Sequence, residues 1–408
     1  MSDAKKLPLE GIKVVELATV VAAPTAGRML CAYGAEVIKV EGLTGDNHRR
    51  CGEFEMTVCE DYKNPLFTIQ NSGKRFVSIN LKSKGGLEAM YKLLSEADIF
   101  LTNVRMPSLV RLGFGWELLH EKFPNLIYGH FSGFGLKGQD CSKPGFDMTA
   151  FWLRNGPLAD WQEPGAFPFT PTYAFGDMAT SSVFFSGLLT ALLGRERTGE
   201  GTLVSVSLEA SGIWCNAIGV VSHQPPFGGE HVNDPLRPAD PFYHFYKCSD
   251  GKYIAVCDNE YKTDMAKIAK IFGLDWMLDD EKYFTLENLA KTDAVVDVVK
   301  AMNAVIETKS SAEWLALLEE NNVSCELMRS IRDVYRDRQA IDNEYVMPVE
   351  FKDGLTVMMP CPPVKFSEFG MREYTPTGRI GEDTDAVFTE LGYSPEEIAS
   401  LRENKEII

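Results

Sequence analysis

Short apolar runs alternate with longer amphipathic segments through the N-terminal half of this chain, and this alternation most constrains its fold. The run KVVEL at 13–17 has the length of a buried strand. The next segment has helical spacing, contains Pro24 near its start and ends at Gly34, and EVIKVE at 36–41 is again strand-like. Because two parallel strands need a crossover of this kind, residues 13–41 predict a βαβ unit.

The same alternation continues beyond this first unit. Further strands are predicted at 76–81, 98–103, 126–131 and 204–208, and further helices at 84–97, 176–199 and 209–221. Strands that alternate with helices form a mostly parallel sheet covered on both faces. We therefore predict an α/β fold in which residues 1–223 form a doubly wound, parallel-sheet large domain.

The composition changes at residues 224–241, where five prolines and two adjacent glycines interrupt any regular element. We interpret this segment as a linker. Beyond it, a hairpin turning at Asp250 and Gly251 and several amphipathic helices predict a smaller α/β domain at 242–330. Residues 331–408 are expected to form a further linker and a C-terminal segment that returns to the large domain, ending in a helix capped by Ser394.

Charge and the lengths of the apolar runs argue against two classes of partner. The chain has 58 acidic and 41 basic residues and a formal charge of −17, which would repel a nucleic acid or an anionic membrane. Its longest nearly apolar run, VFFSGLLTALL from Val183, is far shorter than the ~20 residues of a membrane span. Nine cysteines without a CxxC pair suit a reducing compartment. We expect a cytoplasmic protein without nucleic-acid or membrane partners.

Several cofactor and nucleophile motifs are missing from the sequence. The turn after the first strand reads ATVVAAP rather than GxGxxG, and no GxxxxGK followed by Ser or Thr, no HExxH and no GxSxG is present. The cysteines and the six isolated histidines include no zinc ligand set. These observations disfavour a dehydrogenase, an NTPase, a metalloprotease and an α/β-hydrolase. We expect neither a metal nor a permanently bound cofactor.

Five segments, in this order along the chain, carry a family resemblance. They are LEGIKVVELATVVAAPTAGRMLCAYGAEVIKVE, KRFVSINLKSKGG, DIFLTNVRMPSLVRLGFG, HFSGFGLKG and AFGDMATSSVFFSGLLTALLGRERTGEG. Together with the closing IGEDTDAVFTELGYSPEEI, they resemble family III CoA-transferases, the family of the formyl-CoA and carnitine CoA-transferases. The resemblance covers nearly the whole chain. It implies an acyl-CoA thioester and a free carboxylic acid as substrates, and an interlocked homodimer.

Two segments are most similar to one subgroup of this family. PGFDMTAF at 144–151 and DPFYHFYKCSDGKY at 240–253 resemble the transferases for 2-hydroxyisocaproate and phenyllactate. The formyl-CoA transferases carry a glycine-rich loop where this chain has residues 235–241. The resemblance therefore implies a 2-hydroxy acid, such as 2-hydroxyisocaproate or an aryl-lactate, rather than oxalate or formate.

The resemblance places the catalytic nucleophile at Asp177, because the family's nucleophilic aspartate follows a glycine just before a long apolar helix. A carboxylate there faces the positive end of the helix macrodipole, which is expected to favour its ionised state. Attack on a thioester carbonyl would give an acyl-aspartyl anhydride, and returning CoA thiolate would give an aspartyl-CoA thioester. The alternative interpretation is that Asp177 only caps the helix.

The resemblance also implies a set of residues that hold CoA. They are Asn80, Lys82, Asn103, Arg105, Arg111, Ser132, Gly133 and Lys137. Taken alone, each basic residue would more often be a solvated surface charge, and it is the position within the matched motifs that favours CoA contact, most of all for Lys82 and Arg111. The family's usual polar residue near Val21 and basic residue near Gly42 are absent from this chain. The glycine-rich turn HFSGFG at 130–135 is a candidate source of backbone N–H donors for the oxyanion.

Two alternative functions are compatible with the same fold. An α-methylacyl-CoA racemase uses a histidine and an aspartate as paired bases, but this chain has Phe146 where the histidine would stand, and phenylalanine cannot move a proton. A non-catalytic CoA-ester binding protein would not need the Gly-Asp pair before the helix. Both alternatives are less favoured than CoA transfer.

Overall fold

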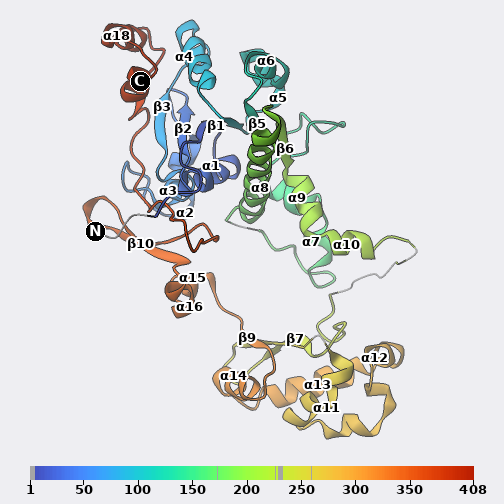
Figure 1. The fold of residues 1–408 in the computed structure, drawn as a ribbon. Helices are drawn as coiled ribbons and strands as arrows, with labels where there is room; N and C mark the ends of the chain where they lie inside the picture. The colour runs from blue at the N-terminus through green and yellow to red at the C-terminus, as the bar shows by residue number, and fades with distance from the viewer. Residues whose placement is uncertain (1–4, 172, 226, 228–232, 259) are drawn as a thin grey trace. The chain divides into compact units, whose positions relative to one another are not determined.

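The computed structural model describes residues 5–171, 173–225, 227, 233–258 and 260–408 and divides them into two compact units. The first unit takes in the described residues of 1–157, 170–227 and 337–408, and the second those of 158–169 and 228–336 (Figure 1). Part of the expected linker at 224–241 lies outside the described residues. Residues 158–169, assigned to the large domain from the sequence, group with the second unit, where Asn233 Nδ2 donates to the Trp161 carbonyl.

The first unit is built on a six-stranded parallel sheet with the order β3-β2-β1-β4-β5-β6. The strands are β1 (Lys13–Leu17), β2 (Glu36–Glu41), β3 (Arg75–Ser78), β4 (Ile99–Thr102), β5 (Ile127–Ser132) and β6 (Leu203–Ser207). The strand order reverses between β1 and β4, as in doubly wound folds. The predicted fold class of the large domain is confirmed.

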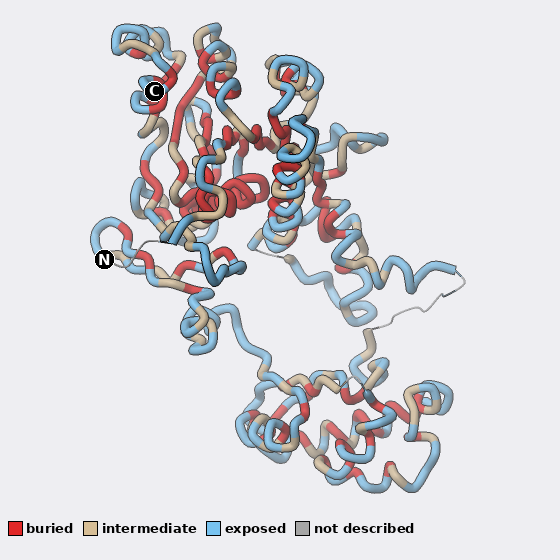
Figure 2. The backbone as a smooth tube through the Cα atoms, in the orientation of Figure 1, coloured by how far each residue is buried: buried red, intermediate tan, exposed pale blue. Residues whose placement is uncertain are grey.

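Helices cover both faces of this sheet. On one face α1 (Ala22–Ala32) packs against α3 (Pro65–Asn71) and α8 (Phe175–Thr198), and every residue of α1 is buried (Figure 2). On the other face α4 (Lys84–Ser95), α5 (Met106–Leu112), α6 (Trp116–Lys122) and α17 (Thr384–Glu390) join one apolar core with the strands. Burial of α1 from all sides fixes the position of the turn that precedes it.

The helix α8 is longer than the apolar run recognised in the sequence. By length and composition alone it is the one helix in the described part of the chain that could cross a membrane. It packs against α1, β5 and β6, which is compatible with a core helix of a soluble protein. The expectation of a single helix at 209–221 is wrong: α9 (Leu208–Cys215) and α10 (Ala217–Ser222) are separated at Asn216, whose side-chain amide donates to the Asn155 carbonyl.

The second unit combines a small antiparallel sheet with helices. Strands β7 (Tyr243–Lys247), β8 (Tyr253–Cys257) and β9 (Cys325–Leu327) form the sheet, and β7 and β8 are joined through the turn at Asp250 and Gly251. Its longer helices are α11 (Tyr261–Ile271), α12 (Leu286–Thr292), α13 (Val295–Ile306) and α14 (Ser311–Glu320). Phe242, Tyr246 and Trp314 lie in its own apolar core, so this is an α/β unit with an independent interior.

The C-terminal segment packs on the first unit. It contains the hairpin β10 (Val346–Glu350) and β11 (Thr356–Pro360) and ends with α18 (Pro395–Glu403), which Ser394 and Glu397 cap reciprocally. The Phe76 N–H donates to Asp383 Oδ2 at 2.7 Å, which ties the tail to β3. The shorter helices are α2 (Gly52–Glu55), α7 (Pro157–Asp160), α15 (Ile331–Val334) and α16 (Arg338–Asp342).

Candidate active site

A cavity of about 360 Å³ lies at the carboxyl ends of the strands in the first unit. Its walls come from residues 19–22 after β1, from residues 103, 105 and 106 after β4, from residues 130–133 at the end of β5 and from Leu208 after β6. The loop from Leu136 to Phe146 and the side of α8 at Asp177 complete it. In open α/β sheets ligands bind at this edge, where the strand order reverses. The cavity is therefore the candidate active site.

Asp177 lies in the first turn of α8 and lines this cavity. The N-cap position of the helix belongs to Ala174, which has a left-handed backbone with φ 52° and makes no side-chain capping hydrogen bond. The helix-capping interpretation of Asp177 is therefore not supported. Its carboxylate is partly buried and faces the cavity without serving the helix end.

The acidity of Asp177 differs from the sequence-based expectation. Burial, together with the nearby carboxylate of Asp147, raises the pKa of Asp177 to about 7. A helix N-terminus was expected to favour the ionised form, and that expectation is wrong, because desolvation and a like charge outweigh the macrodipole. At neutral pH the group is poised between its acid and its ionised form.

Asp147 organises the start of α8 and was missed in the sequence. It begins a π-helical turn, Asp147–Leu153, and its Oδ1 accepts the Asp177 N–H at 3.0 Å. Burial raises the pKa of Asp147, whereas hydrogen bonds from the N–H groups of Asp177 and Gly176 oppose that shift. A carboxylate that binds two N–H groups of a first helical turn fixes the direction of that turn. The signal was the aspartate within PGFDMTAF at 144–151.

Gly176 allows the π-helical turn to pack closely against the start of α8. A Cβ atom at this position would lie 2.3 Å from Phe151 Cγ and 2.4 Å from Asp147 Oδ1, closer than non-bonded atoms approach. The Gly-Asp pair therefore has a physical reason: the glycine allows the π-helical turn to pack directly on the residue before Asp177.

The structure brings together half of the residues predicted to hold CoA. Asn103, Arg105, Ser132 and Gly133 line the same cavity as Asp177. Asn80, Lys82, Arg111 and Lys137 are not among the residues that line it. Lys82 and Asn80 follow β3, at the edge of the sheet and two strands from β1. Contact of these four residues with CoA stays a prediction.

Other residues of the cavity were not selected from the sequence. Lys143 is a second cation in the lining, in addition to Arg105, and Thr19 exchanges two hydrogen bonds with the Asn103 side chain, at 3.0 and 2.8 Å. His130 is buried, its Nε2 lies 3.0 Å from the Val104 carbonyl, and burial lowers its pKa. The topology could have identified Thr19 and Val20, because residues after adjacent parallel strands meet at one edge.

The described residues include no group of three or more His, Cys, Asp or Glu side chains that could hold a metal ion. The cavity instead combines one carboxylate, two cations and apolar side chains, among them Val20, Val21 and Phe131. Such a cavity can bind an anionic ligand with an apolar part and expose one oxygen nucleophile to it.

The sequence profile described as "CoA-transferase family III" matches residues 9–384. The chain belongs to this family. It is 36% identical over 397 residues to a (R)-2-hydroxy-4-methylpentanoate CoA-transferase of Clostridioides difficile, covering 97% of this chain and 98% of the relative. It is 32% identical to a cinnamoyl-CoA:phenyllactate CoA-transferase of Clostridium sporogenes, covering 98% and 97%.

A solved structure supports the same assignment. The CAIB/BAIF family protein from Brucella suis superposes with a TM-score of 0.80 at 26% identity, covering 95% of this chain and all of that one. The resemblance to family III, and to its 2-hydroxyisocaproate and phenyllactate subgroup, is confirmed. This member of the family is accordingly a CoA-transferase, and family members use CoA thioesters as substrates. Racemase activity is not favoured, because the residue that lines the cavity where a racemase would have its histidine is Phe146, which cannot transfer a proton.

Proposed function

We propose that this transferase moves CoA from an acyl-CoA to a 2-hydroxy acid, with Asp177 as the covalent relay. The observation that carries the proposal is a single ionisable carboxylate in a cavity that also presents Arg105, Lys143 and apolar side chains. A pKa of about 7 leaves a substantial ionised fraction at neutral pH and keeps the carboxylate basic enough to attack a carbonyl.

The proposed reaction has two symmetrical halves. An Asp177 oxygen attacks the thioester carbonyl, the carbon–sulfur bond breaks, and a mixed anhydride and CoA thiolate form. The thiolate then attacks the aspartyl carbonyl and releases the first acid as a carboxylate, leaving an aspartyl-CoA thioester. The incoming carboxylate attacks this thioester, expels the thiolate and forms a second anhydride. Attack of the thiolate on the new acyl carbon yields the new acyl-CoA and restores the Asp177 carboxylate.

The cations of the cavity and the residues at the end of β5 have separate roles in this proposal. Arg105 and Lys143 attract the anionic parts of CoA and of the incoming acid into a protein that is acidic overall. Ser132 and Gly133, at the end of β5, are the proposed neighbours of the thioester end. Asn80, Lys82, Arg111 and Lys137, which are not among the lining residues, are proposed to contact the nucleotide part of CoA. CoA is a substrate here rather than a permanently bound cofactor.

The apolar lining and the names of the relatives support the proposed substrate class. Val20, Val21, Met106 and Phe146 present apolar surface to the cavity. The two relatives at 36% and 32% identity are named for a branched and an aromatic 2-hydroxy acid. A pocket of this kind favours a bulky apolar substituent over the compact dianion oxalate.

A panel of acceptors tests the proposed function. With one acyl-CoA donor, we expect kcat/KM for 2-hydroxy-4-methylpentanoate or phenyllactate to exceed that for oxalate and formate by at least about tenfold. Hydroxylamine should trap a covalent adduct formed with acyl-CoA alone, because both intermediates are acyl derivatives of Asp177. Equal use of oxalate would contradict the substrate class, and the absence of an adduct with every donor would favour a CoA-ester binding protein.

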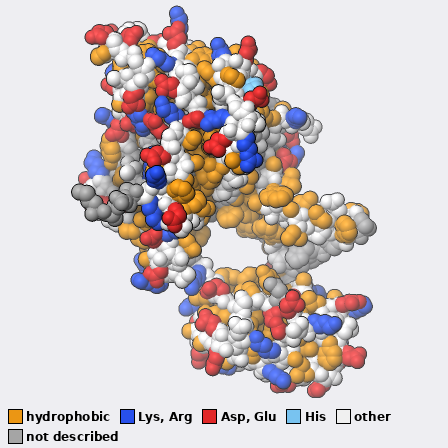
Figure 3. Space-filling view, in the orientation of Figure 1, with side chains coloured by type: hydrophobic (Ala, Val, Ile, Leu, Met, Phe, Trp, Pro, Cys, Tyr) orange, Lys and Arg blue, Asp and Glu red, His pale blue; other side chains and the backbone are white. Residues whose placement is uncertain are grey.

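We also propose a cytoplasmic homodimer. Trp214, Ile218 and Val221 on α9 and α10 are exposed in the single chain, and Figure 3 shows apolar side chains gathered over these helices. Exposed apolar surface of this kind is typical of interfaces between subunits. Light scattering should give twice the chain mass of 45.5 kDa, and a monomer would contradict the proposal.

A further inference from the structure

Val20 adopts a backbone conformation that its side chain disfavours. Its φ is +67°, in the left-handed region, and it follows β1 at the edge of the candidate active site. A β-branched residue is a genuine outlier there, because its Cβ substituents crowd the backbone, whereas glycine occupies the region freely. Strain of this kind persists only where the surroundings impose it, and it is concentrated at functional sites.

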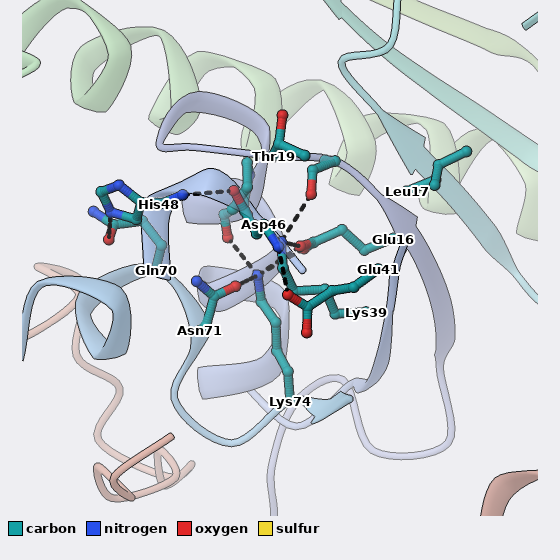
Figure 4. Close-up of polar contacts among 12 residues, drawn as sticks. Glu16, Leu17, Thr19, Lys39, Glu41, Asp46, His48, Gln70, Asn71 and Lys74 are labelled. Carbon is teal, nitrogen blue, oxygen red and sulfur yellow. Dashed lines mark hydrogen bonds and ion pairs between the residues drawn. The ribbon is translucent and has the colours of Figure 1, made fainter. Parts of the chain in front are cut away.

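A buried carboxylate imposes the conformation. The Val20 N–H lies 3.1 and 3.2 Å from the two carboxylate oxygens of Asp46, which is buried. Lys39 Nζ lies 3.0 Å from Asp46 Oδ2 and 3.1 Å from Glu16 Oε1, and neither lysine nor glutamate is exposed to solvent. Figure 4 shows the side chains of Asp46, Lys39 and Glu16 converging on one another. The N–H of Val20 is thus held by a carboxylate that is itself fixed by a buried ion pair.

The carbonyls on either side of Val20 are held by the same cluster of charges. Lys39 donates to the Ala18 carbonyl at 2.8 Å, and Lys74 donates to the Pro24 carbonyl at 2.9 Å. Lys74 also pairs with Glu16 at 2.7 Å, so both lysines share one carboxylate (Figure 4). Relaxation of Val20 to an ordinary conformation would pull the turn away from buried charges, which is strongly unfavourable.

The constrained turn is joined to the helix that carries the nucleophile. Ser181 Oγ on α8 lies 2.5 Å from the Ala22 carbonyl and 2.6 Å from the Asp177 carbonyl. Val20 itself is 43% exposed and lines the same cavity as Asp177. The buried charges therefore present an apolar side chain to the cavity at a place fixed relative to the reacting carboxylate.

We propose that Val20 determines acyl specificity: its isopropyl group, held in the cavity by Asp46, packs against the apolar substituent of the substrate acid. A turn that needed only its backbone shape would be served better by glycine, which has no strain in the left-handed region. We therefore expect the valine side chain, rather than the backbone shape of the turn, to have the function at this position. This inference rests on the proposed function, because it states which part of the substrate acid, its apolar substituent, contacts Val20.

Two substitutions separate side-chain contact from backbone strain. Val20→Gly removes both, and Val20→Ala removes the isopropyl methyl groups but keeps a Cβ in the left-handed region. With one donor, kcat/KM would be measured for 2-hydroxy-4-methylpentanoate and for 2-hydroxypropanoate, which lacks the branched substituent. We expect the ratio of the two values to fall about tenfold in both variants, through loss of the branched acid's advantage. Val20→Gly should also have a Tm equal to or above that of the parent.

The outcomes are distinguishable. If the parent transfers CoA to both acids and neither variant changes the ratio, Val20 does not read the substituent and the inference is overturned. An equal fall in kcat/KM for both acids would show that Val20 has only a structural role in the turn, and this result would also overturn the inference. A parent inactive toward both acids would instead remove the proposed function on which the inference rests.

Discussion

Asp177→Asn should reduce turnover of CoA transfer by at least ~1,000-fold while the protein remains folded. The relay needs an ionisable oxygen nucleophile, and the amide of asparagine cannot form the anhydride or be restored from it. Asn matches Asp in size, and no helix cap is lost, because the side chain does not cap α8. The measurement is single-turnover transfer, together with hydroxylamine trapping of the adduct. Transfer by the Asn variant at a rate close to the parent's would show that another residue is the nucleophile.

The same variant should be more stable than the parent at high pH. The pKa of Asp177 in the folded protein, about 7, lies above the ~3.9 of an unfolded aspartate. Between these values the folded state binds more protons than the unfolded state, so this group lowers the free energy of unfolding as the pH rises from ~4 to ~7. Asn does not titrate. The Tm of Asp177→Asn should therefore exceed the parent's at pH 8, and the difference should disappear near pH 4.

The pH dependence of the parent provides a control on this assignment. If ionised Asp177 is the nucleophile, kcat/KM should rise with pH to a plateau, with a limb near pH 7. The carboxylate of Asp147 contributes to the raised pKa, so Asp147→Asn should move the limb to lower pH. A limb that stays in place in the Asp147 variant would mean that burial alone sets the acidity of Asp177.

The fold was predictable from the sequence where local periodicity decides it. KVVEL and EVIKVE became β1 and β2 because short segments rich in valine and isoleucine favour strands, and the intervening helical spacing became α1. The break at Asn216 was not predictable, because the side chain that occupies it binds the Asn155 carbonyl, a contact that does not follow from periodicity. The order of the strands in the sheet was likewise not predictable, because the periodicity of apolar residues indicates where strands form but not which strands pair.

Features of the candidate site that depend on contacts between distant parts of the chain were not predictable from the sequence. The Gly-Asp pair before an apolar helix did mark Asp177 as a candidate, and the structure places this residue in the cavity, whereas its role as the nucleophile stays a prediction. The effect of Asp147 on its acidity depends on a turn 30 residues earlier that packs on Gly176. Similarly, the strain at Val20 arises from Asp46, which the sequence places beyond the next strand. Asn103 lines the cavity and Asn80 does not, because β4 adjoins β1 whereas β3 lies at the sheet edge.

Gly176→Ala should lower turnover by about 100-fold, although the substitution adds only one methyl group next to the proposed nucleophile, Asp177. The added Cβ would lie 2.3 Å from Phe151 Cγ and 2.4 Å from Asp147 Oδ1, and neither a ring nor a carboxylate bound to two N–H groups can yield cheaply. The first turn of α8 must therefore move, and displacement of a reacting group by about 1 Å costs roughly 100-fold. Overpacking should also destabilise the protein by about 1–3 kcal/mol.

Gly194→Ala is the matched control, because it changes the same residue type in the same helix. A Cβ at position 194 would meet no atom within 4 Å. Alanine is favoured over glycine inside a helix by about 0.5–1 kcal/mol, so this variant should keep full activity and gain slightly in stability. Turnover and thermal unfolding should be measured for both variants. The comparison distinguishes displacement of the first turn at Asp177 from any effect of adding a methyl group elsewhere in α8. Full activity of Gly176→Ala would show that the first turn tolerates displacement, and that the contact between Asp147 and the helix does not position the nucleophile.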